Sequence, residues 1–189
     1  AAKRLAYSMM GVKDVERVMM VQFHQSYSYE DFIMGFRPSA TGFELKKGAF
    51  YNFCKKAEVD SDNEYFFIID EINRGNLSKI FGELFMLIEN DKRGNALQLL
   101  YSDEKFAVPK NVYIIGTMND IDRSVESMDF AMRRRFAWKE ITAESRQSML
   151  DEDDTWKPYE KPAPNIIAEM KARMDNLNSA IIDQYGEKE

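Results

Sequence analysis

Two carboxylates, Asp70 and Glu71, follow four apolar residues in the stretch "FFIIDEINRGN". The apolar and aromatic residues predict a strand at 65–70 that is buried on both faces. A carboxylate at the end of a buried strand is unfavourable unless its charge is paired or bound to a cation. We therefore expect Asp70 to hold Mg²⁺ and Glu71 to polarise a water, which suits phosphate chemistry. The alternative is a strand that simply ends in charged loop residues.

A second strand, predicted at 111–119, ends in Asn119. In open α/β sheets ligands bind beyond the carboxyl ends of the strands, so Asn119 is expected beside Asp70 and Glu71 if the two strands are neighbours. Its neutral amide could hold an attacking water or a terminal phosphate without neutralising the carboxylate base. The stretch "NDIDRS" continues from Asn119 as a compact polar segment.

Three consecutive arginines, 133–135, end a helix that is predicted at 124–135. Because this helix separates them from Asn119, we expect them to project toward the phosphates of a neighbouring subunit. A planar guanidinium is well suited to stabilising spread phosphoryl charge. The alternative is that the three cations only stabilise the C-terminal end of the helix.

Strands and helices alternate along the chain, which predicts an α/β fold with a parallel sheet. Apolar runs predict strands at 17–23, 65–70, 111–119 and 136–141. Helical periodicity predicts helices at 1–10, 28–36, 49–59, 76–90, 124–135 and 166–186. Between these elements we expect a turn-rich segment at 37–48, a hairpin within 97–109, and an acidic, proline-rich linker beyond about residue 142.

The bulk composition is typical of a soluble globular protein, and 189 residues are enough for one sizeable core with a small appendage. A net charge of −6 argues against a nucleic-acid surface over the whole domain, although a local basic patch remains open. A single cysteine excludes an internal disulfide and favours a reducing, cytoplasmic compartment. No apolar run approaches the roughly 18 residues of a membrane span, so no membrane contact is expected.

The motifs, in this order, resemble those of the AAA+ NTPases. "YFFIIDEINRGN" resembles a Walker B segment, "VYIIGTMND" a sensor-one strand, and "MDFAMRRRF" the helix that carries arginine fingers. Within this group the chain resembles the McrB family, the GTP-dependent motors of modification-dependent restriction systems. "MNDIDRS" is similar to the McrB signature "MNTADRS", with Asp120 and Ile121 in place of Thr and Ala. The resemblance covers about residues 1–141.

The resemblance implies a three-layer, P-loop NTPase-like parallel sheet with helices on both faces, followed by part of an α-helical lid. It divides the chain into a nucleotide-hydrolysing core at 1–141 and a linker with a partial lid at 142–189. It also implies Mg²⁺, GTP or ATP as the substrate, a homo-oligomeric ring that we expect to be a hexamer, and a McrC-like nuclease subunit as partner. DNA would be contacted through domains outside this chain.

The resemblance assigns a role to each candidate site residue. Asp70 would hold Mg²⁺ through water, and Glu71 would be the catalytic base. The residues around the attacking water would be Asn119, Asp122 and Arg123. The arginine finger, acting across the subunit boundary, would be Arg135 together with Arg134.

One AAA+ motif is missing from the chain: no "GxxxxGK[ST]" occurs, and its expected place is immediately before Ala1. The central strand that precedes this loop, and a later lid segment, are likewise expected outside the chain. The fragment alone is therefore expected to bind nucleotide poorly and to be inactive, because loop amides and a lysine supply much of the phosphate affinity. Two alternative functions stay open: an AAA+ ATPase that remodels protein partners, and a catalytically silent module for ring assembly.

Overall fold

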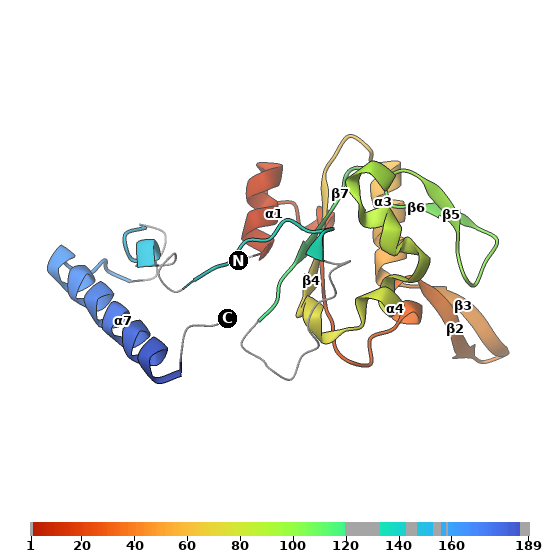
Figure 1. The fold of residues 1–189 in the computed structure, drawn as a ribbon. Coiled ribbons are helices and arrows are strands. Elements are labelled where there is room, and N and C mark those ends of the chain that lie inside the picture. Colours follow the sequence, from red (N-terminus) through yellow and green to blue (C-terminus); the bar gives the residue numbers. More distant parts are fainter. Residues whose placement is uncertain (1, 120–132, 143–146, 153–155, 158, 186–189) are drawn as a thin grey trace. The chain divides into compact units, whose positions relative to one another are not determined.

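The computed structural model describes residues 2–119, 133–142, 147–152, 156–157 and 159–185, in two compact units, Ala1–Ala137 and Trp138–Glu189 (Figure 1). The α-helices of the first unit are α1 (Ala2–Met10), α2 (Tyr29–Phe32), α3 (Ala49–Val59) and α4 (Leu77–Phe81). Its short 3-10 helices are η1 (Val15–Arg17), η2 (Ile72–Arg74), η3 (Gly82–Ile88) and η4 (Asn90–Lys92). Its strands are β1 (Val18–Gln22), β2 (Met34–Ser39), β3 (Gly42–Lys47), β4 (Tyr65–Asp70), β5 (Ala96–Gln98), β6 (Lys105–Ala107) and β7 (Val112–Gly116).

Three of these strands form a parallel sheet in the order β1-β4-β7, with Val18 opposite Phe66 and Ile69 opposite Gly116. The central strand β4 is buried on both faces, because its successive side chains point to opposite sides of the sheet. Figure 1 shows α1 on one side of the sheet and α3 and α4 on the other. The predicted α/β class, with a parallel sheet between helices, is confirmed.

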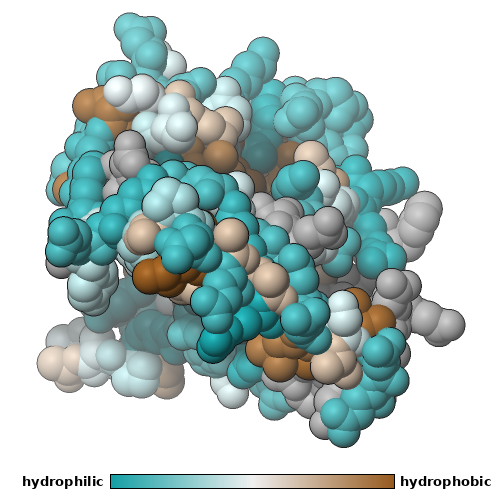
Figure 2. Space-filling model, turned by 90° about the vertical axis from the view of Figure 1, so that its left-hand side faces the viewer, coloured by the Kyte–Doolittle hydropathy of each residue, from teal (hydrophilic) through white to brown (hydrophobic). Residues whose placement is uncertain are grey.

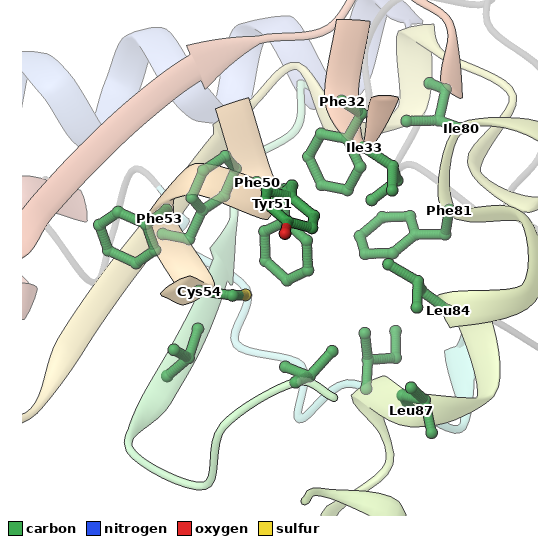
Figure 3. Close-up of a cluster of buried hydrophobic side chains, with 14 of the residues drawn as sticks. Phe32, Ile33, Phe50, Tyr51, Phe53, Cys54, Ile80, Phe81, Leu84 and Leu87 are labelled. Atoms are coloured by element: carbon green, nitrogen blue, oxygen red, sulfur yellow. The ribbon is translucent and has the colours of Figure 1, made fainter. Parts of the chain in front are cut away.

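The main core lies between the sheet and α2, α3 and α4, and it is rich in aromatic side chains (Figure 3). Phe32 stacks on Phe50 with ring centroids 4.7 Å apart. It also makes edge contacts with Phe67 at 5.6 Å and Phe81 at 4.8 Å. The Cys54 thiol lies in the same core, where burial raises its pKa, so we expect it to pack rather than react.

Replacing Phe32 with Ala is expected to lower the free energy of unfolding by about 3–5 kcal/mol, because a fully buried ring that contacts several others would leave a cavity. Urea denaturation measures the change. The matched control is Phe43→Ala, because Phe43 is 75% exposed and its loss should change stability by less than about 0.5 kcal/mol. Equal effects at the two positions would contradict this account of the core.

The helix predicted at 76–90 is two elements, because the chain bends sharply at Gly82. Asn76 caps the start of α4 by accepting a hydrogen bond from the Lys79 amide at 3.0 Å. Gly82 then adopts φ +52, and a Cβ at this position would lie 2.9 Å from the ring of Tyr29. The turn therefore requires glycine, and the chain continues as the 3-10 helix η3.

The helix predicted at 28–36 is too long, and the segment predicted as turn-rich at 37–48 is mostly a hairpin. The helix α2 ends at Phe32, and β2 pairs antiparallel with β3. Phe36 lies opposite Leu45 and Pro38 opposite Phe43, so apolar residues alternate along both strands. The turn-forming residues among these strands led to the prediction of a turn-rich segment instead of a hairpin. The predicted hairpin within 97–109 is confirmed by the pairing of β5 and β6.

The strand predicted at 136–141 is wrong. Phe136 packs against the core of the first unit, and residues 137–142 have no regular secondary structure. A strand needs a hydrogen-bonded neighbour, and within the described part of the chain no strand pairs with this segment. In the helix predicted at 124–135, residues 124–132 lie outside the described residues.

The second unit contains η5 (Gln147–Leu150) and α7 (Pro164–Tyr185), the latter confirming the predicted last helix. Leu150 and Ile167 are buried in this unit. Trp156 Nε1 donates a hydrogen bond to the Leu150 carbonyl at 2.9 Å.

Among the described residues, no helix is both long and apolar enough to cross a membrane. On the face that Figure 2 shows, hydrophobic residues form separate small patches among hydrophilic ones.

Candidate active site at the ends of β4 and β7

Asp70 is the last residue of the central strand, and it is held on both sides. Its carbonyl accepts a hydrogen bond from the Phe23 amide at 2.9 Å, on the β1 side of the sheet. On the β7 side, its Oδ1 accepts a hydrogen bond from the Thr117 hydroxyl at 2.5 Å. The carboxylate therefore lies half-buried at the carboxyl edge of the sheet, where ligands of α/β proteins bind.

Glu71 has a left-handed backbone conformation, with φ 52 and ψ 46. It is the only residue other than glycine with a positive φ in the described part of the chain. This conformation costs roughly 1–3 kcal/mol, and such strain is concentrated at functional sites. The Glu71 side chain is 24% exposed, and its Oε2 forms an ion pair of 3.0 Å with Arg74 Nε. Glu71 is the residue immediately before η2, and its left-handed conformation connects the buried strand β4 to this helix.

Asn119 lies three residues beyond the end of β7 and is exposed. Its main-chain carbonyl accepts a hydrogen bond of 3.4 Å from Asn73 Nδ2, and Asn73 is two residues beyond Glu71. The ends of β4 and β7 are thus neighbours, which was the condition for placing Asn119 near the two carboxylates. The side chain that contacts Asp70, however, is that of Thr117. Asp122 and Arg123 lie outside the described residues.

The two predicted finger arginines have different surroundings. Arg135 forms an ion pair of 2.7 Å with Glu89, its guanidinium carbon lies 4.3 Å from the centroid of the Phe85 ring, and its side chain is only 8% exposed. Arg134 is 4.0 Å from the same Glu89 carboxylate, but its side chain is 61% exposed. Arg135 is therefore packed against η3 of its own chain, whereas Arg134 is open to solvent. Arg133 is also exposed.

The donor set at the sheet edge fits Mg²⁺ of the kind that binds together with a nucleotide. Among the described residues, no group of three or more His, Cys, Asp or Glu side chains could hold a metal ion. Mg²⁺ in phosphate-transfer sites needs no such group, because one or two carboxylates, waters and substrate phosphates complete its octahedron. Asp70 supplies one carboxylate at the end of the central strand, which meets this requirement.

Sequence reasoning missed three residues of this site: Thr117, Asn73 and Arg74. Thr117 falls within the strand predicted at 111–119, and its place opposite Asp70 follows from the parallel register that pairs Ile69 with Gly116. Asn73 and Arg74 lie within "DEINRGN", where their polarity was the available signal.

Gly116, the last residue of β7, allows η2 to pack closely against this strand. A Cβ at Gly116 would lie 2.8 Å from Cδ1 of Ile72, which is the first residue of η2. The small residue thus lets η2 pack against β7 directly after Glu71.

Residues 1–136 match the family of the AAA domain (dynein-related subfamily). Since this match covers most of the chain, the protein belongs to that family of AAA domains. The sheet between helices and the polar strand ends agree with this class.

Within this class, the chain is 49% identical over 190 residues to the type IV methyl-directed restriction enzyme EcoKMcrB subunit of Escherichia coli (strain K12), and the match covers 95% of this chain and 40% of that protein. It is also 27% identical over 146 residues to the type II restriction enzyme BsuMI component YdiS of Bacillus subtilis (strain 168), covering 70% of this chain and 41% of that protein. The predicted resemblance to McrB is confirmed. The chain spans about two fifths of the length of these relatives.

Proposed function

We propose that this chain is part of the NTP-hydrolysing core of a McrB-like motor in a modification-dependent DNA restriction system. The proposal rests on the carboxyl ends of β4 and β7, which are neighbours in the parallel sheet. Asp70, Glu71 and Thr117 lie together there. The 49% identity to a restriction-enzyme subunit supports the biological setting. GTP is the proposed substrate, with ATP as the alternative.

In this proposal the two carboxylates have separate roles. Asp70 would hold Mg²⁺ through a bound water, and the bound ion would supply positive charge that neutralises the phosphates. Glu71 acts as the general base: it takes a proton from the water that attacks the terminal phosphorus, and the bond to the leaving diphosphate breaks. Arg74 holds Glu71 Oε2, which fixes the orientation of the base.

The residues after β7 complete the proposed site. The roles proposed for Asn119, Asp122 and Arg123 are to hold the attacking water and the terminal phosphate. The charge that develops on the phosphate is stabilised by arginine from the neighbouring subunit. Of the two predicted fingers, Arg134 has the accessible side chain, and Arg135 supports it through its contacts with Glu89 and Phe85.

The wider assembly is proposed from the resemblance to McrB. It consists of a ring, with six subunits expected, and a McrC-like nuclease subunit, and it acts in the cytoplasm. Residues 1–141 form the hydrolytic core, and residues 142–189 form a linker and part of a helical lid. DNA is recognised by segments outside this chain.

The test measures phosphate release by the full-length protein with Mg²⁺ and either GTP or ATP. We expect GTP turnover that is stimulated by a McrC-like nuclease subunit, together with cleavage of modified DNA. Turnover of ATP alone, without any effect on DNA, would favour a protein-remodelling ATPase. If the protein forms rings but hydrolyses neither nucleotide, the proposal is wrong and the silent assembly module is supported.

A further inference from the structure

The position of Thr117 is fixed by the main chain on both sides of the Asp70–Glu71 pair. Its amide donates to the Ile69 carbonyl at 2.9 Å, and its carbonyl accepts from the Ile72 amide at 2.9 Å. These two bonds extend the β4–β7 ladder beyond Ile69 and Gly116, the last pair of the regular register. Thr117 is thus hydrogen-bonded to the residue before Asp70 and to the residue after Glu71. It cannot shift without breaking one of these two bonds.

The Thr117 hydroxyl is directed at Asp70 as a consequence. A β-branched side chain has few χ1 rotamers, and in the rotamer that Thr117 adopts the hydroxyl contacts Asp70. An ionised carboxylate only accepts hydrogen bonds, and therefore the hydroxyl must be the donor to Asp70 Oδ1. Valine has the same shape as threonine but could not make this bond.

The hydrogen bond makes the two carboxylate oxygens of Asp70 different in their surroundings. Within the described residues, Oδ1 has Thr117 as its partner, and no hydrogen bond or ion pair is formed by Oδ2. We propose that Thr117 is a positioning residue that holds Oδ1, so that Oδ2 is presented to a water of the nucleotide-bound metal ion. This inference rests on the proposed function, because it assumes that Asp70 holds the metal. Partners that orient a metal-binding carboxylate are typically worth about 10–100-fold in metal affinity or activity.

The experiment compares Thr117→Val and Thr117→Ser in the full-length protein. Mn²⁺ affinity is measured by electron paramagnetic resonance in the presence of a non-hydrolysable GTP analogue, and the Mg²⁺ dependence of kcat and of KM is measured in parallel. We expect Thr117→Val to weaken Mn²⁺ binding by about 10–100-fold and to raise the Mg²⁺ concentration needed for half-maximal turnover. Thr117→Ser keeps the hydroxyl and should restore both values to within about threefold of the wild type.

Circular dichroism and thermal melting show whether each variant is folded, and Thr117→Ala replaces Thr117→Val if the latter is not. Wild-type Mn²⁺ affinity in the folded Val or Ala variant would overturn the role of Thr117 while leaving the proposed function intact. If the Ser variant were as weak as the Val variant, a hydroxyl donor would not be what matters, and the proposal would fail. If the wild type itself bound no metal–nucleotide complex, the proposed function and this inference would fail together.

Discussion

Glu71→Gln is expected to lower nucleotide turnover by the full-length protein about 10²–10⁴-fold, while nucleotide binding stays close to that of the wild type. Gln has nearly the same shape, so it should accept the left-handed conformation at a cost similar to that for Glu71. It cannot take a proton from water, however. The expected defect is therefore in kcat, which single-turnover phosphate release measures directly.

The control for this substitution is Glu58→Gln, which makes the same chemical change at an exposed position on α3, where Glu58 pairs with Lys55 at 3.1 Å. It should hydrolyse nucleotide as the wild type does. Unchanged turnover in Glu71→Gln would remove Glu71 as the base. A loss of nucleotide binding equal to the loss of turnover would instead assign it to substrate binding.

Arg134→Ala is expected to lower turnover in the assembled ring by about 10³–10⁵-fold, the range typical of arginine fingers. The physical reason is that its 61% exposed guanidinium is available to a neighbour's terminal phosphate. Arg133→Ala, an exposed arginine next in sequence, serves as the matched comparison. Assembly is checked by analytical ultracentrifugation, so that a loss of the ring is not mistaken for a loss of catalysis.

Mixing two inactive variants tests whether Arg134 acts across the subunit boundary. In a mixed ring of Glu71→Gln and Arg134→Ala subunits, some sites combine an intact Glu71 with an intact Arg134 from the neighbour. Such rings should regain part of the turnover that each variant lacks alone. If mixing restores nothing although mixed rings form, Arg134 does not act in trans.

Arg135→Ala should behave differently, because Arg135 packs within its own chain. Its removal leaves Glu89, whose side chain is 28% exposed, without the ion pair of 2.7 Å and leaves Phe85 without its cation contact. We expect a loss of about 1–3 kcal/mol in the free energy of unfolding, measured by urea denaturation. A stable variant that has lost turnover would instead make Arg135 the finger.

The long apolar elements of the fold could be predicted from the sequence, because burial alone determines their pattern. The run 65–70 has no polar residue before its end, and it forms the buried central strand β4. The bend at Gly82 could not be predicted, because the ring of Tyr29, which leaves no room for a Cβ there, comes from a distant part of the chain. The strand predicted at 136–141 had a suitable pattern, but within the described residues it has no neighbour with which to pair.

For the candidate site, the sequence identified the groups but not their arrangement. Asp70 and Glu71 could be predicted because carboxylates after a buried run are unusual. The left-handed conformation of Glu71 has no sequence signal, since glutamate rarely adopts it. The hydrogen bond from Thr117 depends on the register between two strands, in which Ile69 lies opposite Gly116, and the sequence alone does not determine this register. The different burial of Arg134 and Arg135 depends on η3, which is distant in sequence.

The central claim is that nucleotide is hydrolysed at the joined ends of β4 and β7. It is tested most directly by the structure of the full-length protein with Mg²⁺ and a non-hydrolysable GTP analogue. The account predicts that the terminal phosphate faces Glu71 and Asn119, and that a water of the metal ion contacts Asp70 Oδ2 while Thr117 still holds Oδ1. A nucleotide bound away from these strand ends, or a metal ion held by other side chains, would contradict it.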